Sequence, residues 1–543
     1  MKNAVRRTAL AGIIGCALYS SPALADWKVA ETENFVYYSQ SPAEEIIENT
    51  KNLEKFNALV RALTNNTKPP SPVKVVIYEV ATMEDVNATF PYPSQGVGGY
   101  YSSTYMGPFL VTFRNNLKTA EKSVNRTQQR SYRWGPEVRQ HEYLHHYMYQ
   151  YFNANYPTWY SEGFAEYYGT MAFPDESVVE VGHAPFFRLT AIKGGNWMHV
   201  RELLTAKSYA DVKNISALYA QGWLLTHMAS QRSDRGKQLQ QYLQAIVDGQ
   251  DYTEAAEAAF GDLDQLNKDL KAHMDSLKAM KLSLKPMDFG PLAVRELSDV
   301  ESEMMRYQIR LSSGFAVSTL PLVVKTANEI AAKEPGSIMA WEVVARLENL
   351  AGLHDQARQT AQRLLGLDPQ NVIGLTEMGR ALAGPLTATS SDEEWSEARD
   401  WMKRAIAISA VASDPRIALF KTYEQQGVLP SIEAQNRLVE AFQLLPQNDE
   451  VRYLLARDFE QRGLIDDAIE IIKPSAFGSF DGDDSEKRKR KRLADSAAQR
   501  FTNITSYESA IDMLKRLQEK QDAETAEQMA AEPAQPAVAS TAS

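Results

Sequence analysis

This sequence has a single cysteine, and it lacks long apolar runs and an excess of positive charge. Its 543 residues include one cysteine, Cys16, and no stretch beyond the N-terminus approaches the roughly 18 apolar residues that a membrane-spanning helix needs. Lys and Arg number 58 against 69 Asp and Glu, a formal net charge of −11. This sign argues against a nucleic-acid partner, because phosphate binding needs a basic surface. The remaining composition, 44% hydrophobic and 23% charged, is that of a globular protein too long for one core.

The N-terminus has the parts of a secretory signal: basic residues, an apolar run over 8–19, and the pattern Ala-Leu-Ala over 23–25. We expect a signal peptide over 1–25 that is removed on secretion across the inner membrane, leaving a soluble protein of the periplasm. Ile-Ile-Gly-Cys over 13–16 also resembles a lipobox, so a form with a lipid anchor on Cys16 is the alternative. The apolar run continues past Cys16, which favours the soluble form. A soluble mature chain then has no cysteine and no disulfide.

Hydrophobic periodicity predicts an α+β chain. Short β-branched runs at 73–78 and 109–113 flank a glycine-rich segment, and 42–63 has apolar residues at helical spacing. The front part is therefore a mixed sheet with helices. From about residue 137 the helical pattern continues almost to the end of the chain. The expected parts are a mixed-sheet and helical domain over 26–290, an all-α repeat domain over 297–518, and a disordered tail over 519–543.

The second half of the sequence repeats itself. Gly352 and Ala357 recur as Gly463 and Ala468 at the same separation. The small residues Ala357, Ala398, Ala434 and Ala468 are spaced by 41, 36 and 34 residues. This spacing resembles the tetratricopeptide repeat, which has a 34-residue period and small residues where its two helices touch. A generic helical solenoid is the alternative and predicts the same shape. Either array presents a concave surface, so we expect a peptide or protein partner there.

One short segment combines metal-binding and basic groups. His141, Glu142 and His145 form the pattern His-Glu-x-x-His. Residues i and i+4 of a helix share a face, so both histidines can bind one ion, while Glu142 can reach a water beside it. A catalytic zinc ion needs a third protein ligand and one open position. A second helix from Thr158 carries Glu162, which a short antiparallel connection can bring to the same ion. A surface helix that happens to carry histidines is the alternative.

The downstream residues add a family resemblance. His-Glu-x-x-His, followed 17 residues later by the Glu of Trp-x-x-Glu-Gly-Phe-Ala over 159–165, resembles the gluzincin clan of zinc peptidases. Its closest match is to the aminopeptidase-N-like and peptidase MA-like branches. The resemblance implies that Glu162 is the third ligand of one zinc ion per chain and Glu142 the catalytic base. It also implies that Glu166 holds a ligand histidine by a hydrogen bond. Glu166 as the ligand, with Glu162 structural, is the alternative.

Two further segments bear on the resemblance. Tyr219 begins Tyr-Ala-Gln-Gly, which is similar to the Tyr-Glu-Lys-Gly of aminopeptidase-N-like enzymes, whose tyrosine stabilises the oxyanion. A core tyrosine is the alternative. Those enzymes also have a Gly-x-Met-Glu-Asn strand whose Glu binds the substrate's free amine, and the nearest counterpart, 96–101, has no carboxylate. This difference favours an endopeptidase in which the segment is an edge strand that pairs with substrate backbone.

We therefore expect a secreted zinc-dependent peptidase, more an endopeptidase than an exopeptidase. Zinc-activated water attacks the peptide bond, with Glu142 as general base. The repeats would recruit a peptide or protein substrate or a partner protein, so deletion from about residue 297 should weaken hydrolysis of proteins more than of short peptides. Two alternatives come from other classes: a catalytically inactive, repeat-based periplasmic binding or scaffold protein, and a zinc amidase that acts on non-protein amides.

Overall fold

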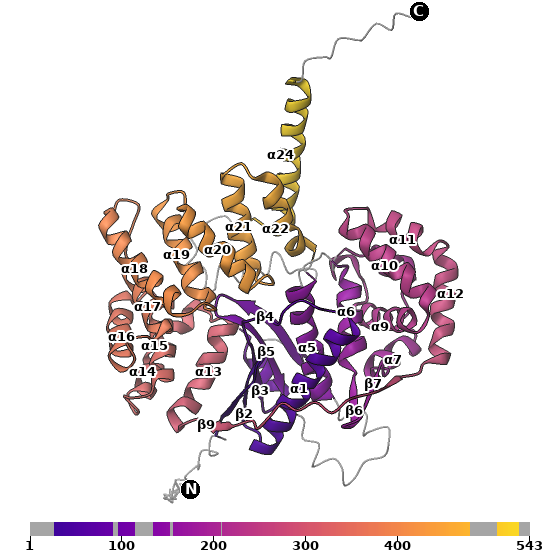
Figure 1. The fold of residues 1–543 in the computed structure, drawn as a ribbon, viewed down its shortest axis with the longest axis horizontal. Helices are drawn as coiled ribbons and strands as arrows, with labels where there is room; N and C mark the ends of the chain where they lie inside the picture. Colours follow the sequence, from indigo (N-terminus) through magenta and orange to yellow (C-terminus); the bar gives the residue numbers. More distant parts are fainter. Residues whose placement is uncertain are drawn as a thin grey trace, which may run out of the picture.

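The computed structural model describes residues 26–90, 96–114, 134–152, 156–207, 209–477 and 508–531. The expected signal peptide, with Cys16, lies outside these residues, as does the end of the tail, 532–543. Within the described ranges, no helix is both long and apolar enough to cross a membrane. Figure 1 shows a sheet at the centre, with one group of helices on its right and a helical array on its left and above it.

The central sheet is built from runs that favour strands. β2 (Phe35–Ser39) alternates buried and half-buried residues, as a period of two requires, and β3 (Val75–Val80) is rich in β-branched residues. The other strands are β1 (Lys28–Glu31), β4 (Gly99–Thr104), β5 (Gly107–Phe113) and β9 (Val294–Glu296). Among the described strands the order is β4-β5-β3-β2-β1-β9, with β2, β3 and β5 parallel and the other pairs antiparallel. The expected mixed sheet is confirmed, and β4 lies at its edge.

Helices cover the sheet and extend from it to form one large apolar core. The α-helices of this first part are α1 (Ala43–Leu63), α2 (Met83–Ala88), α5 (Trp134–Tyr151), α6 (Thr158–Gly169), α7 (Phe186–Lys193), α8 (Val200–Thr205), α9 (Ile215–Gln231), α10 (Ser233–Val247), α11 (Tyr252–Phe260) and α12 (Leu263–His273). Short 3₁₀ turns occur at η1 (Tyr209–Asp211) and η2 (Met274–Ser276). The core draws residues from the sheet, from α1, α5 and α6, and from α9 to α12, so these elements form one folded unit.

The chain after α6 is less uniformly helical than the sequence suggests. A second sheet is formed by β6 (Ala172–Asp175), β7 (Val178–Val181) and β8 (Met280–Ser283). β9 returns to the first sheet and pairs with β1, although it lies beyond the expected domain end at residue 290. The prediction of continuous helix was therefore wrong at these strands. Each is three or four residues long, too short for its periodicity to differ from that of a helix segment.

The second part of the chain is an array of helices packed in sequence order (Figure 1). The small residues of the sequence repeat, Ala357, Ala398, Ala434 and Ala468, are each fully buried. They lie on every second helix, where a methyl group allows the neighbouring helix to approach closely. The expected helical repeats are thus confirmed. The elements are α13 (Asp299–Ser313), η3 (Val317–Thr319), α14 (Leu320–Ala331), α15 (Ile338–Leu350), α16 (His354–Leu367), α17 (Val372–Ala383), α18 (Asp392–Ile408), α19 (Ser413–Gln426), α20 (Ile432–Leu444), α21 (Asp449–Gln461) and α22 (Ile465–Phe477).

The tail differs from its predicted disorder. Helix α24 (Ala510–Ala531) continues well past residue 519. Its first turns bury Met513, Leu514 and Leu517 in a cluster shared with α21 and α22. From Gln518 to residue 527 the side chains are mostly exposed. The prediction was therefore wrong for 519–531, because a helix anchored at its start propagates cheaply through good helix formers such as Ala, Glu, Gln and Lys.

Candidate metal centre

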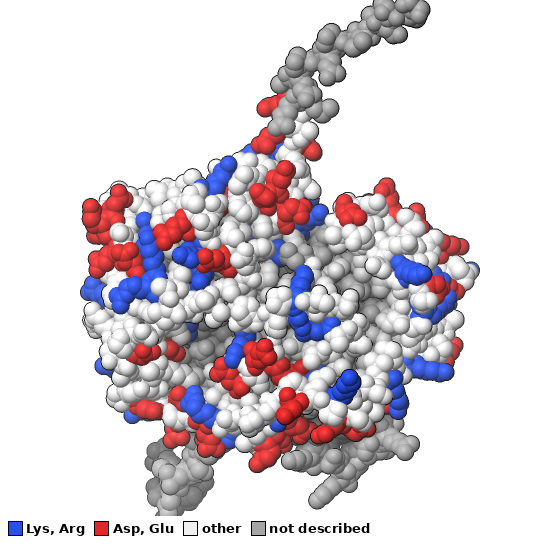
Figure 2. All heavy atoms as spheres, viewed as in Figure 1, with Lys and Arg blue, Asp and Glu red and all other residues white. Residues whose placement is uncertain are grey.

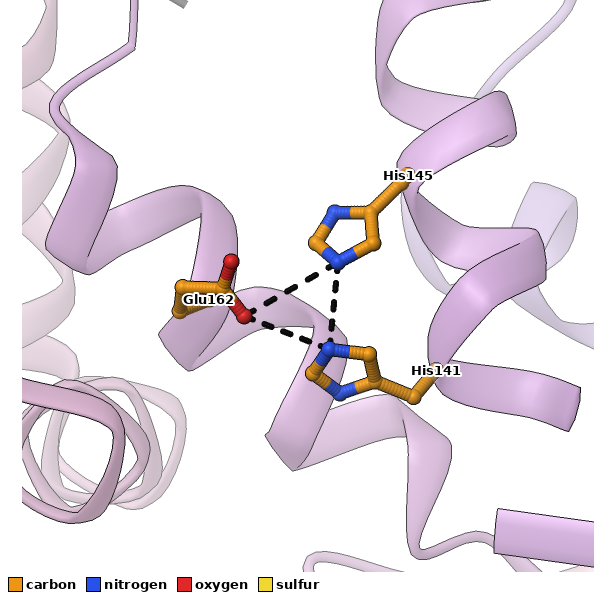
Figure 3. Close-up of side chains that lie close together, drawn as sticks. All are labelled: His141, His145 and Glu162. Atoms are coloured by element: carbon orange, nitrogen blue, oxygen red, sulfur yellow. Dashed lines mark hydrogen bonds and ion pairs between the residues drawn. The ribbon is translucent and has the colours of Figure 1, made fainter. Parts of the chain in front are cut away.

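Three donor atoms from two helices converge on one point (Figure 3). His141 Nε2 lies 3.1 Å from His145 Nε2 and 3.2 Å from Glu162 Oε2, and His145 Nε2 lies 3.8 Å from the same oxygen. Tetrahedral zinc, with bonds of about 2.0–2.2 Å, separates its ligand atoms by roughly 3.3–3.6 Å. The triangle therefore has the size that one such ion requires.

Local sequence explains how the two helices present these groups. His141 and His145 are one turn apart on α5, and α6 begins directly after Pro157, which favours a helix start there. Gly163 lies against Gly222 of α9, where an added Cβ would come within 2.4 Å of the Gly222 carbonyl oxygen. Only glycines allow these helices to cross this closely. The crossing fixes the position of Glu162, the neighbour of Gly163.

The chemistry of the donor set fits a divalent cation. Glu162 is fully buried, and its Oε2 faces the Nε2 atoms of both histidines. Burial opposes ionisation of this carboxyl, yet the adjacent His145 and His141 and the hydrogen bond from Tyr209 lower its pKa to about 2. Burial, more than any neighbouring charge, lowers the pKa of His145 to about 3. Two imidazoles and a buried carboxylate form the nitrogen and oxygen set that zinc prefers.

The contact between His141 and Glu162 indicates the position that such a cation would take. Burial works against the charged imidazole, but the contact with Glu162 and the nearby Glu166 outweigh burial and raise the pKa of His141 to about 9. The contact with Glu162 thus favours the protonated imidazole, with His141 Nε2 directed at the carboxylate. A metal ion bound at this point would take the place of that proton, as ligand deprotonation on metal binding requires.

Glu142 lies beside the three donors and lines a cavity of about 570 Å³. Burial raises the pKa of Glu142 to about 7, against the smaller lowering effects of His141 and of the nearby backbone amide of Tyr101 on β4. A carboxylate with a pKa near neutrality is suited to exchange protons at physiological pH. The same cavity is bordered by residues 96–99 at the start of β4 and by His141, Glu166, Arg188 and Tyr219.

Tyr219 and Glu166 both contact one arginine, Arg188. The Arg188 guanidinium carbon lies 4.3 Å from the centre of the Tyr219 ring, and Arg188 Nε donates to Glu166 Oε1 at 2.8 Å. The Tyr219 ring is nearly parallel to that of His141, with centroids 6.2 Å apart. Glu166 Oε1 is 3.9 Å from His141 Nδ1, longer than a hydrogen bond. The carboxylate that faces both Nε2 atoms is therefore that of Glu162, and Glu166 faces the opposite nitrogen of His141.

Two residues of the site have no counterpart in the sequence motifs. Tyr209 on η1 donates its hydroxyl proton to Glu162 Oε1, the oxygen that points away from the histidines. Arg188 on α7 contacts both Glu166 and Tyr219. Tyr209 lies 47 residues from Glu162 and Arg188 lies 22 residues from Glu166. Neither stands in a pattern that would distinguish it from other tyrosines and arginines.

No protein-family model matches this chain, and no curated protein does. The gluzincin resemblance consequently stands on the motif residues alone. Solved structures similar to the chain include the thermophilic TPR protein TTC0263 from Thermus thermophilus, at 18% identity over 35% of this chain and 93% of that one, with a TM-score of 0.27. MamA is similar at 17% identity over 36% of this chain and 99% of that one, with a TM-score of 0.24. Likeness at this level carries no argument about function.

Proposed function

We propose that this chain is a zinc-dependent peptidase, and an endopeptidase rather than an exopeptidase. The observation that carries the proposal is the convergence of His141, His145 and Glu162, with His141 and the neighbouring Glu142 bordering one cavity. A ligand triangle with one open side and an adjacent carboxylate is the arrangement that hydrolysis of an amide needs. Neither motif nor geometry alone would support the proposal as well as their agreement does.

The residues take complementary parts in hydrolysis. A zinc ion, when bound by the three ligands, supplies a Lewis acid that polarises the scissile carbonyl. Glu142 accepts a proton from the attacking water and passes it to the leaving amine. Tyr219 donates a hydrogen bond to the oxygen that gains negative charge, a charge present only in the transition state. Arg188 fixes the ring of Tyr219 by stacking on it.

Strand β4 would hold the substrate. It is the edge strand of the first sheet, and residues 96–99 at its start border the cavity. An edge strand can add an extended peptide through main-chain hydrogen bonds, which require neither terminus of the peptide. Residues 96–101 include no carboxylate that could bind a free amine. These features favour cleavage within a chain.

Paired substitutions test the assignment. Glu142→Gln should retain one zinc ion per chain and abolish hydrolysis of unfolded protein and peptide libraries, because the base is lost and the ligands are kept. Glu162→Ala should lose zinc. Glu176→Gln, which neutralises an exposed carboxylate on the β6–β7 turn, is the matched control and should change neither property. Unchanged turnover in Glu142→Gln would remove Glu142 from the mechanism, and a tightly metallated Glu162→Ala would transfer the ligand role to Glu166.

A repeat-based binding or scaffold role is the second candidate. It is favoured by a cavity of about 400 Å³ between the helices of the array, bordered by Arg346, His354 and Lys421 among others. Figure 2 shows acidic and basic side chains mixed over the visible face of the array, which suits a polar peptide or protein partner. Zinc-loaded protein that binds polypeptides without cleaving them would favour this role. Cleavage of small-molecule amides alone would favour a zinc amidase.

The proposed peptidase acts outside the cytoplasm, because the first 25 residues have the pattern of a secretory signal. N-terminal sequencing of the protein recovered from the periplasm tests this part. A mature terminus at Asp26 would support a soluble form, a lipid-modified Cys16 would support an anchored one, and an intact Met1 would contradict secretion through this signal.

A further inference from the structure

The hairpin that joins β4 to β5 has an unusual tip. Thr104 pairs with Gly107, so the connecting turn consists only of Tyr105 and Met106. Two-residue hairpin turns favour asparagine, aspartate and glycine, which adopt the required backbone conformations in water. Two large apolar side chains at such a turn indicate that the tip contacts another part of the molecule rather than solvent.

That contact is with the helical array. Ser413 at the start of α19 donates its hydroxyl to the Tyr105 carbonyl at 3.0 Å, and Asn448 before α21 donates its side-chain amide to the Ser103 carbonyl at 3.0 Å. These partners are separated by 308 and 345 residues in sequence. Figure 1 shows β4 extending from the sheet towards the array.

The side chains at the tip pack into two different parts of the array. Tyr105 packs against the apolar cluster of α19, α20 and α21, and the guanidinium carbon of Arg380 lies 5.1 Å from its ring centre. Met106 packs against the cluster formed by α13, α14 and α15. Arg380 is itself held by ion pairs with Glu377 and Asp414. The tip therefore packs against both apolar and charged side chains that come from several repeats.

The opposite end of the same strand borders the candidate catalytic base. A Cβ added to Gly99 would lie 3.3 Å from Glu142 Cγ, so the backbone of β4 lies directly against this side chain. Among the described strands, β4 pairs with β5 alone. On its other side no described strand pairs with it, so its position depends on β5 and on contacts elsewhere along the hairpin. A strand of six residues, about 20 Å long at 3.3 Å per residue, thus connects the array to the base.

We propose that the helical array anchors the β4–β5 hairpin and thereby holds β4 in place beside Glu142, with Ser413 and Asn448 as positioning residues. The catalytic consequence rests on the proposed peptidase function. Anchoring differs from substrate recruitment in what it predicts. A recruiting array matters for proteins and little for short peptides, whereas an anchoring array matters equally for both, because every substrate meets the same strand and base.

Asn448→Ser tests the anchor in the full, zinc-loaded chain. Asn448 also caps α21 by accepting from the Val451 amide at 2.8 Å, and serine caps a helix about as well but is too short to reach Ser103. Asn371→Ser is the matched control, since Asn371 caps α17 in the same way and donates to Glu342 instead. Ser413→Ala removes the other hydrogen bond from a different helix, so the test does not depend on one variant folding.

Hydrogen exchange of the 96–114 segment, zinc content and hydrolysis of a short and a long substrate are then compared. Asn448→Ser should quicken exchange of this segment about fivefold, the factor that corresponds to about 1 kcal/mol for one hydrogen bond. It should lower kcat/KM for both substrates by the same factor, with zinc content unchanged, and Asn371→Ser should do neither. The double Asn448→Ser, Ser413→Ala variant should show a larger effect of the same kind.

Unchanged exchange in both anchor variants would overturn the proposal, as would faster exchange with normal hydrolysis of the short peptide. A loss confined to the protein substrate would also overturn it and would support recruitment. If the unmodified protein hydrolyses neither substrate, the proposed peptidase function fails, and the exchange experiment still decides whether the array anchors the hairpin.

Discussion

Replacing Tyr209 with Phe should weaken zinc binding while the fold is preserved. The Tyr209 hydroxyl donates to Oε1 of Glu162, and the other oxygen of Glu162 faces both histidines. Phenylalanine fills the same space without the donor. Loss of a hydrogen bond to a metal ligand typically costs 10–100-fold in metal affinity. We expect an increase of this size in the zinc Kd, about 1.4–2.8 kcal/mol.

The loss of zinc affinity should be large because Glu162 and Tyr209 are both buried. Glu162 is 0% exposed and Tyr209 is 4% exposed, so water cannot replace the missing donor. An unsatisfied buried polar group costs about 1–3 kcal/mol, which agrees with the range expected from zinc affinity. The hydrogen bond also orients the carboxylate, so its loss should act on the bound state more than on folding.

Competition with a chelator of known affinity measures the zinc Kd. Tyr252→Phe is the matched control, because Tyr252 is also 4% exposed and its hydroxyl has no hydrogen-bond partner among the described residues. Its zinc Kd should equal that of the unmodified protein. A Tyr209→Phe value within twofold of the unmodified protein would refute the reasoning, as would an equal shift in both variants.

Two further substitutions test the packing and the charge of the first folded unit. Gly163→Ala forces a methyl group against Gly222, so it should lower the unfolding free energy by about 1–3 kcal/mol and weaken zinc binding. Gly366→Ala is the control: Gly366 lies in a helix with open space at that point, so alanine there should stabilise the protein by up to about 1 kcal/mol. Urea unfolding compares them, and equal effects would contradict the tight helix crossing. Burial lowers the pKa of His227 to about 4, so the folded state binds fewer protons than the unfolded one, and its share of stability is present above about pH 6.5 and lost as pH falls towards 4. His227→Gln should therefore lose less stability between pH 7 and pH 5 than the unmodified protein, and an identical pH dependence would exclude this assignment.

Local patterns in the sequence predict the parts of the site that depend on local geometry. His141 and His145 could be paired because helical spacing alone puts them on one face. Glu162 could be predicted as the third ligand from a second helix after a short connection, together with the family resemblance. Tyr209 and Arg188 could not be found in this way, since their contacts depend on how α6, α7 and η1 meet in space. Contacts between elements that are distant in sequence leave no periodic pattern in it.

The same limit applies to the fold. The mixed sheet and the helical repeats follow from patterns that recur over many residues, and both were predicted. The short strands β6 to β9 were missed because three or four residues define no period. The insertion of Tyr105 and Met106 into the array was also missed, although two apolar residues at a hairpin turn are a signal that could have been used.

The dependence of hydrolysis on bound zinc tests the central claim most directly. Metal-free protein is titrated with zinc, and cleavage of an unfolded protein substrate is measured at each step. We predict no cleavage without metal, a rise in rate in proportion to added zinc, and a plateau at one ion per chain. Cleavage that persists in the metal-free protein, or full zinc occupancy without cleavage, would contradict the account.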